Sequence, residues 1–148
     1  MSAAESRATG GPAIEVISDA GTVLAYLLRA EVTSDRTRFL TPQELNLQLG
    51  LIVYKGGQRV APHRHLPVVR TTRGTMEAIV VREGLCDVDI YDEAQRRVAT
   101  RTLVPGDLVL LVGGGHGFRM REDTVLLEVK EGPYIEGNDK VTFDDPGQ

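Results

Sequence analysis

The chain has little of what usually identifies a secreted, membrane-spanning or nucleic-acid-binding protein. Its one cysteine, Cys86, cannot form an intrachain disulfide and suits a reducing compartment. Apolar runs such as 108–112 are too short to cross a bilayer, and segment 1–12 lacks the apolar core of a secretory signal. The basic residues are scattered through a chain of net charge −4, which disfavours a nucleic-acid-binding face. We therefore expect a soluble cytoplasmic protein that binds neither membranes nor nucleic acid.

The remaining composition is that of one globular domain. The 148 residues are 41% hydrophobic and 26% charged, which is enough to build one core. We expect residues 13–141 to form this domain. Segment 1–12 and the tail 142–148 are rich in small and polar residues, so we expect a disordered leader and a loose tail.

The pattern between these ends predicts an all-β protein. Short apolar or alternating runs are separated by Gly, Pro, Asp and Asn, as in sandwiches and barrels. The expected strands are 13–18, 22–28, 45–54, 77–83, 86–92, 96–103, 107–112 and 124–130. The one helical candidate is a single turn at 41–45, where Thr41 and Glu44 fit a capping box.

Two of these strands alternate cleanly between apolar and polar positions. In 86–92, Asp87, Asp89 and Tyr91 alternate with apolar residues, which predicts one core face and one solvated face. In 45–54 the leucines at odd positions share a face, with Asn46 and Gln48 opposite.

The three histidines are the strongest functional signal. On an extended segment, His63 and His65 project to the same side. His116 follows three glycines, and Glu77 begins an apolar strand. Three imidazoles and one carboxylate suit a divalent transition metal. The alternative is that each residue is a solvated or hydrogen-bonded surface group.

Taken together, these residues resemble the two motifs of the cupin family. The first motif is Gly, five residues, His-x-His, three or four residues, Glu, six residues, Gly. It is matched by Gly57, His63, His65, Glu77 and Gly84, except that eleven residues (66–76) separate His65 from Glu77. The second motif extends from Gly106 to His116; it is one residue short, lacks the usual proline and has Met120 in place of asparagine.

The resemblance implies a single-domain cupin, a double-stranded β-helix with a jelly-roll-like barrel. It implies one divalent transition metal, with iron(II) as the first expectation and manganese, nickel or zinc as alternatives. The metal ligands would be His63, His65, Glu77 and His116.

The resemblance also suggests how a substrate would be bound. Phe118 and Met120 would extend the wall beyond His116 as an apolar lining. Arg70 and Arg73 are candidates for holding a carboxylate or phosphate, with a solvated basic loop as the alternative; Tyr54 is a further candidate for contact with the ligand.

Three functions are compatible with such a site. The leading hypothesis is a metal-dependent enzyme acting on a small polar metabolite, by dioxygenase-type or sugar or keto-acid isomerase-type chemistry. The alternative is a non-catalytic cupin that binds a small ligand or carbohydrate, and a third is a subunit that modulates a partner protein. No catalytic residue is assigned beyond the ligands. By analogy with small cupins we expect a homodimer, with strands 13–28 supplying an edge.

Overall fold

The computed structural model describes residues 13–145 and 147. The expected leader 1–12 and positions 146 and 148 of the expected tail lie outside the described residues. The described chain contains strands and turns and no helix, so the all-β prediction is confirmed. Among these residues there is accordingly no helix of the length and apolarity needed to cross a membrane.

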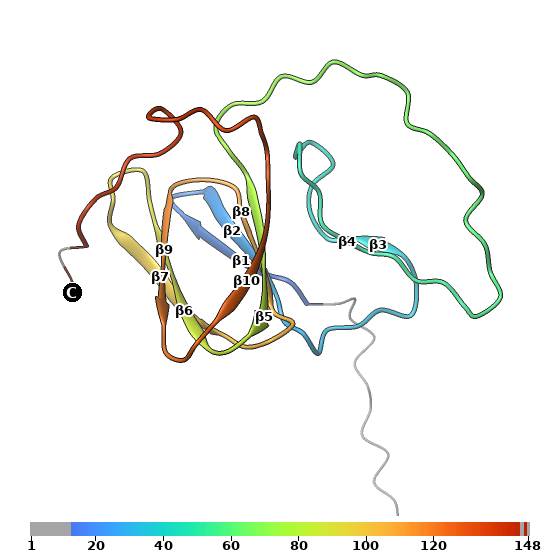
Figure 1. Ribbon diagram of the computed structural model, residues 1–148, viewed down its shortest axis with the longest axis horizontal. Helices are drawn as coiled ribbons and strands as arrows, with labels where there is room; N and C mark the ends of the chain where they lie inside the picture. Colours follow the sequence, from blue (N-terminus) through green and yellow to red (C-terminus); the bar gives the residue numbers. More distant parts are fainter. Residues whose placement is uncertain (1–12, 146, 148) are drawn as a thin grey trace, which may run out of the picture.

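Within the described residues, ten strands form two main antiparallel sheets and one small one (Figure 1). The five-stranded sheet has the order β1-β2-β8-β5-β10, the three-stranded sheet the order β7-β6-β9, and β3 pairs with β4. The strands are β1 (Glu15–Asp19), β2 (Thr22–Leu28), β3 (Arg38–Phe39), β4 (Gly50–Leu51), β5 (Glu77–Glu83), β6 (Cys86–Tyr91), β7 (Arg97–Leu103), β8 (Leu108–Leu111), β9 (Gly115–Met120) and β10 (Val125–Lys130).

One hydrophobic core lies between the two main sheets. The five-stranded sheet contributes residues such as Leu24, Ile79 and Val109, and the three-stranded sheet contributes Val88 and Ile90. Val88 and Ile90 occupy alternate positions of β6, as do Ile79 and Val81 of β5, which places each pair on the core face of its sheet. The two sheets remain separate among the described residues, and the closed cupin barrel stays a prediction.

Seven of the eight predicted strands are observed with similar bounds, and two observed strands, β3 and β9, were not predicted. β9 was not expected from its pattern, because Gly115 and Gly117 interrupt its apolar positions. The predicted strand 45–54 is reduced to β4. Its alternation of exposure is confirmed, since odd positions from Leu45 to Val53 are half-buried and Asn46 and Gln48 are exposed.

The helical turn expected at 41–45 is instead a simple hydrogen-bonded turn. The N–H of Leu45 donates to the carbonyl of Pro42 over 3.3 Å. Thr41 does not cap a helix; its hydroxyl oxygen accepts a hydrogen bond from the N–H of Leu49, 3.0 Å away. Thr41 thus joins the two sides of a hairpin-like unit built around β3 and β4.

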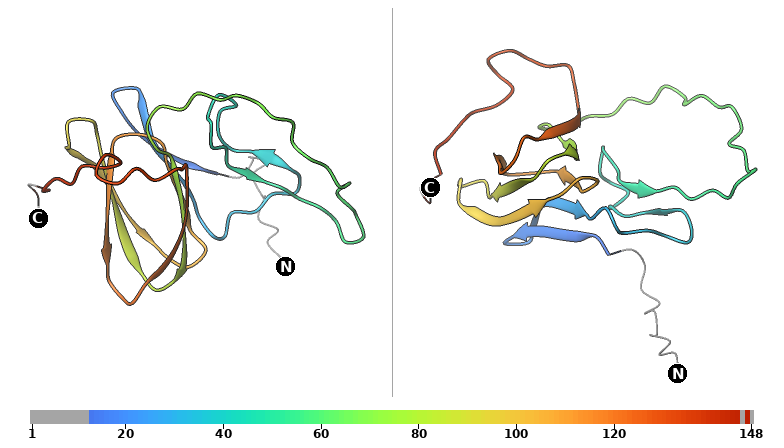
Figure 2. Two further views of the ribbon diagram at one scale, coloured as in Figure 1. Left: turned by 45° about the horizontal axis from the view of Figure 1, so that its top comes forward. Right: turned by 60° about the horizontal axis from the view of Figure 1, so that its bottom comes forward.

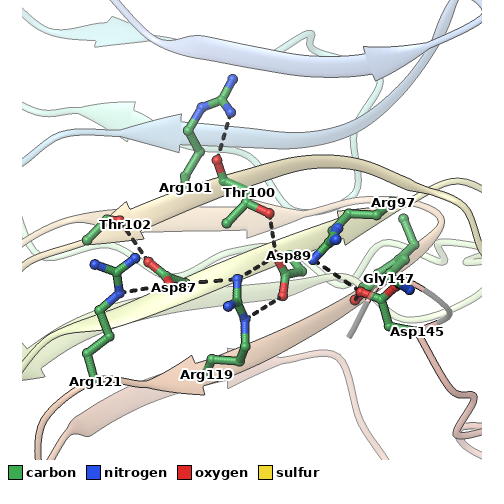
Figure 3. Close-up of polar contacts among 11 residues, drawn as sticks. Asp87, Asp89, Arg97, Thr100, Arg101, Thr102, Arg119, Arg121, Asp145 and Gly147 are labelled. Atoms are coloured by element: carbon green, nitrogen blue, oxygen red, sulfur yellow. Dashed lines mark hydrogen bonds and ion pairs between the residues drawn. The ribbon is translucent and has the colours of Figure 1, made fainter.

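The prediction that Asp87, Asp89 and Tyr91 form a solvated face is wrong. Asp87 and Asp89 are each only 1% exposed, and Tyr91 is buried as well. Side chains from the neighbouring strands β7 and β9, and from Arg121 just after β9, cover Asp87 and Asp89 (Figure 3). The pattern could not reveal this, because long arginine side chains can cover a polar face while their own ends stay in water.

The two buried carboxylates are compensated by arginine and threonine. Arg121 Nε donates to Asp87 over 2.8 Å, and Thr102 donates to the same carboxylate over 2.7 Å. Arg119 Nε donates to Asp89 over 3.0 Å, and Thr100 donates to Asp89 as well (Figure 3). The outer face of the three-stranded sheet is therefore held by a charge network.

This network lowers the pKa of Asp87. Burial by itself would raise that pKa, but the hydrogen bonds from Thr102 and Arg121 and the charges of Arg121 and Arg119 outweigh it. At the end of the same face, the Tyr91 hydroxyl donates to Asp145 over 2.8 Å and the Phe143 ring packs edge-on against Tyr91. Part of the expected tail thus contacts the sheet.

A further buried carboxylate, Asp107, anchors the chain where it leaves the two main sheets. Asp107 is fully buried and accepts hydrogen bonds from the N–H groups of Ala30 and Val104 and from the Arg29 guanidinium, at 2.8–3.0 Å. Gly106 has φ +91°, and a Cβ there would lie 2.8 Å from the Cβ of Ala30. The segments that contain Ala30 and Gly106 are therefore packed closely together at this point.

Residues 31–75, which we call the arm, extend away from the two main sheets (Figures 1 and 2). The arm contains the β3–β4 unit and then a stretch without regular structure, in which every residue from Tyr54 to Thr75 is exposed. It ends at Met76, whose N–H donates to Glu131 over 3.0 Å. Both ends of the arm are thus fixed to the sheets, while its middle projects into solvent.

We predict that Asp107→Ala will lower the free energy of unfolding by about 2–4 kcal/mol, because three donors lose a buried acceptor. Urea denaturation measures this change. Asp144→Ala, at an exposed carboxylate, is the matched control and should have little effect. An unchanged midpoint for Asp107→Ala would show that water replaces the carboxylate.

We predict that Asp87→Asn will destabilise the protein by about 1–3 kcal/mol at pH 7, because it removes charge-assisted hydrogen bonds. A carboxylate whose pKa is lowered by folding stabilises the fold above its unfolded pKa, near 3.8, and loses this contribution as pH falls further. The difference between the two proteins should therefore shrink below pH 4. A difference that is constant from pH 7 to pH 3 would contradict this assignment.

Candidate metal centre

Two of the four predicted ligands, His116 and Glu77, lie together. Glu77 begins β5 and is on the same face as the buried Ile79 and Val81. His116 is the second residue of β9 and pairs with the buried Ile90, so its side chain is on the core face of its sheet. His116 Nε2 is 3.0 Å from Glu77 Oε2. The contact joins the two main sheets at one end of the core.

The glycines before His116 allow β9 to begin at this position. Gly114 has φ +61°, and a Cβ there would collide with the carbonyl oxygen of Tyr91. Only glycine therefore permits the chain to turn from β8 into β9 so close to β6. The sequence "GGGH" thus fixes the place of the imidazole.

The His116–Glu77 pair lies beside an apolar side chain and is partly accessible to solvent. The Phe118 ring lies edge-on to the imidazole of His116, with centroids 6.1 Å apart, and packs against the core. The side chains of His116 and Glu77 are 33% and 16% exposed. One imidazole nitrogen and one carboxylate oxygen at this separation suit a divalent transition metal as two of its ligands.

Three charged residues beside the pair were missed by the sequence reasoning. Lys130 is directly opposite Glu77 in the β5–β10 register, and Glu128 is opposite Ile79, so both are on the core-facing side. Lys130 Nζ is 3.7 Å from Glu128 and 3.9 Å from Asp139. In the predicted strand 124–130, Glu128 and Lys130 alternate with apolar residues and share a face with Leu126. This alternation could have indicated their position from the sequence.

The other two predicted ligands lie together on the exposed part of the arm. The rings of His63 and His65 are 5.4 Å apart between centroids. His63 Nδ1 is 2.9 Å from the carbonyl oxygen of Ala61. Because a carbonyl only accepts, Nδ1 is the donor, which leaves Nε2 of a neutral His63 ring free to bind a metal.

The structure does not bring the two halves of the predicted ligand set together. Within residues 13–145 and 147, no group of three or more His, Cys, Asp or Glu side chains is placed to hold a metal ion. The segment 59–65, for which an extended strand was considered, has no regular structure. The four-ligand site stays a prediction, divided between the arm and the two main sheets.

The predicted substrate-binding residues are also divided. Arg70, Arg73 and Tyr54 are exposed on the arm. Arg70 lines an open depression of about 530 Å³ with Gln43, Glu44, Leu45, Asn46 and Gln48. Phe118 is half-buried beside His116, whereas Met120 at the end of β9 is 53% exposed.

The chain has no significant match to a protein-family model, to a curated protein or to a solved structure. The resemblance to cupins therefore depends on the motif residues of the sequence.

We predict that His116→Ala will change the free energy of unfolding by less than about 1 kcal/mol, because contacts between partly exposed polar side chains contribute little. Chemical denaturation of metal-free protein tests this. A loss above about 2 kcal/mol would mean that the contact between His116 and Glu77 is structural.

Proposed function

We propose that the chain is a cupin and acts as a metal-dependent enzyme on a small polar metabolite. The observation that carries the proposal is the 3.0 Å approach of His116 to Glu77. These residues come from the two separate sequence motifs and meet across the two main sheets, on the faces that enclose the core. The expected double-stranded β-helix would form if the arm covered the open side beside them.

The donor chemistry supports a transition-metal centre with His63, His65, Glu77 and His116 as ligands. His116 and Glu77 are already adjacent, and the His63 ring has its Nδ1 occupied and its Nε2 available. Nitrogen and carboxylate donors of this kind suit iron(II) first, with manganese, nickel and zinc as alternatives. When bound, such a metal would act as a Lewis acid or bind dioxygen.

The residues around the pair have defined roles in this proposal. Phe118 provides an apolar surface beside the imidazole and limits the access of water. Lys130, opposite Glu77, is 3.7 Å from Glu128 and 3.9 Å from Asp139, so it offsets the charge of these carboxylates beside the site. Arg70 and Arg73 would bind a carboxylate or phosphate of the substrate only if the arm moves toward the two main sheets.

A non-catalytic cupin that binds a small ligand or carbohydrate is the second candidate. The observation that favours it is that all three histidines of the chain belong to the proposed ligand set. No imidazole is therefore left to act as a free general acid or base. Turnover assays with keto acids, sugars and sugar phosphates, compared with binding of the same compounds by calorimetry, separate the two functions.

We predict that protein purified without a polyhistidine tag contains close to one transition-metal ion per chain. His63→Ala and His116→Ala should each lower the metal content at least about tenfold, because each removes a ligand. Glu77→Gln should lower it less, because an amide oxygen is a weaker ligand that is retained at the same place. Elemental mass spectrometry of freshly purified protein makes the measurement.

The matched control is Arg64→Ala, which changes the residue between the two arm histidines and leaves all four ligands in place. It should retain the metal content of the wild type. Wild-type protein that binds none of the four metals, even after reconstitution without oxygen, would overturn the proposed metal centre and leave ligand binding as the function to test.

A further inference from the structure

The two main sheets have an open side formed by two unpaired strand edges. β9 is the last strand of the three-stranded sheet and β10 is the last strand of the five-stranded sheet, and each pairs on one side only. The two strands follow one another in the chain, connected by residues 121–124. The His116–Glu77 pair lies between these two sheets.

The strands at this open side also expose apolar side chains. Val125, Leu127 and Val129, on the face of β10 that points away from the core, are each about half exposed, and so is Met120 at the end of β9. Unpaired strand edges with exposed apolar residues favour pairing with another segment of chain, and proteins normally cover them. A covering segment is therefore expected on this side of the molecule.

The arm has complementary properties. Its exposed part carries Val60, Leu66, Val68 and Val69, and Val69 is 97% exposed. An extended segment of this kind can add to a sheet edge by main-chain hydrogen bonds, with alternate side chains filling apolar positions. It also carries the two histidines that the metal centre lacks.

The charges of the two surfaces are opposite. Residues 55–74 of the arm contain Lys55, Arg59, Arg64, Arg70 and Arg73 and no carboxylate. Residues 121–140, which include β10 and its flanking turns, carry more acidic than basic side chains: Glu122, Asp123, Glu128, Glu131, Glu136 and Asp139 against Arg121, Lys130 and Lys140. Attraction between these segments would favour docking and set its orientation.

The arm is attached at both ends and is long enough to reach another molecule. Its ends are fixed to the main sheets at Ala30 and at Met76, and between them it projects outward. The eleven residues 66–76 that follow His65 span up to about 36 Å when extended, which is long enough to cross to a neighbouring molecule. Exchange of such an element between identical chains covers the open side of both copies under two-fold symmetry.

We propose that the metal centre is completed between two copies of this chain by exchange of the arm. His63 and His65 of one protomer would join Glu77 and His116 of its partner, and the arm would cover the β9 and β10 edges. The inference rests on the proposed metal function, and it specifies how the four ligands are brought together.

Complementation between variants tests the exchange. One variant carries His63→Ala and His65→Ala, and the other carries Glu77→Gln and His116→Ala. The two chains are co-expressed with different tags that do not bind metal, and mixed dimers are isolated by tandem purification. In an exchanged mixed dimer, one site has four intact ligands and the other has none.

The mixed dimer should contain about half the metal of the wild-type dimer, whereas each variant alone should contain less than about a tenth. Mixed dimers without metal, alongside a wild type that binds metal, would overturn the exchange and indicate that each arm closes on its own chain. A wild type that binds no metal would instead count against the proposed function.

A disulfide crosslink that does not depend on metal tests the arm exchange separately from the proposed metal function. In a Cys86→Ser background, Val69→Cys on the arm of one chain and Leu127→Cys on β10 of the other should form a disulfide between chains on mild oxidation. Native mass spectrometry should show a covalent dimer. A monomeric mass for the mixture, together with an intrachain disulfide when both cysteines are on one chain, would overturn the proposal.

Discussion

The burial of β6 on both faces is the constraint on which much of the structure depends. One face supplies the core, and the other carries Asp87 and Asp89, each almost inaccessible to solvent. Carboxylates in such a place are tolerated only when charged and hydrogen-bonded partners surround them. Arginine and threonine from β7 and β9, together with Arg121 just after β9, supply these partners, so the three-stranded sheet is held by polar contacts outside and apolar contacts inside.

This arrangement also places the candidate site. Because β9 pairs with β6 in a fixed register, its odd and even residues are assigned to opposite faces. Arg119 must point outward to Asp89, so His116 and Phe118 must point inward. The imidazole thereby reaches Glu77 on the opposing sheet. The charge network and the His116–Glu77 contact thus depend on the same register.

The arm is the part of the chain for which the structure describes the fewest stabilising contacts. It exposes apolar and basic side chains while its two ends are well fixed. The sheets in turn expose two edges and an acidic segment. The arm is basic and the segment beside the sheet edges is acidic. The ligands of the proposed metal centre are likewise divided, with two on the arm and two on the main sheets.

The sequence by itself determined the all-β class, most strand positions and the core-facing residues, because alternation of apolar side chains follows from strand geometry. It also marked the histidines and Glu77 as candidates. Only the tertiary structure decided that Asp87 and Asp89 are covered, that Lys130 is opposite Glu77, and that His63 and His65 are on a projecting arm. These features depend on which strands are neighbours and how far a side chain reaches, and no local pattern encodes either.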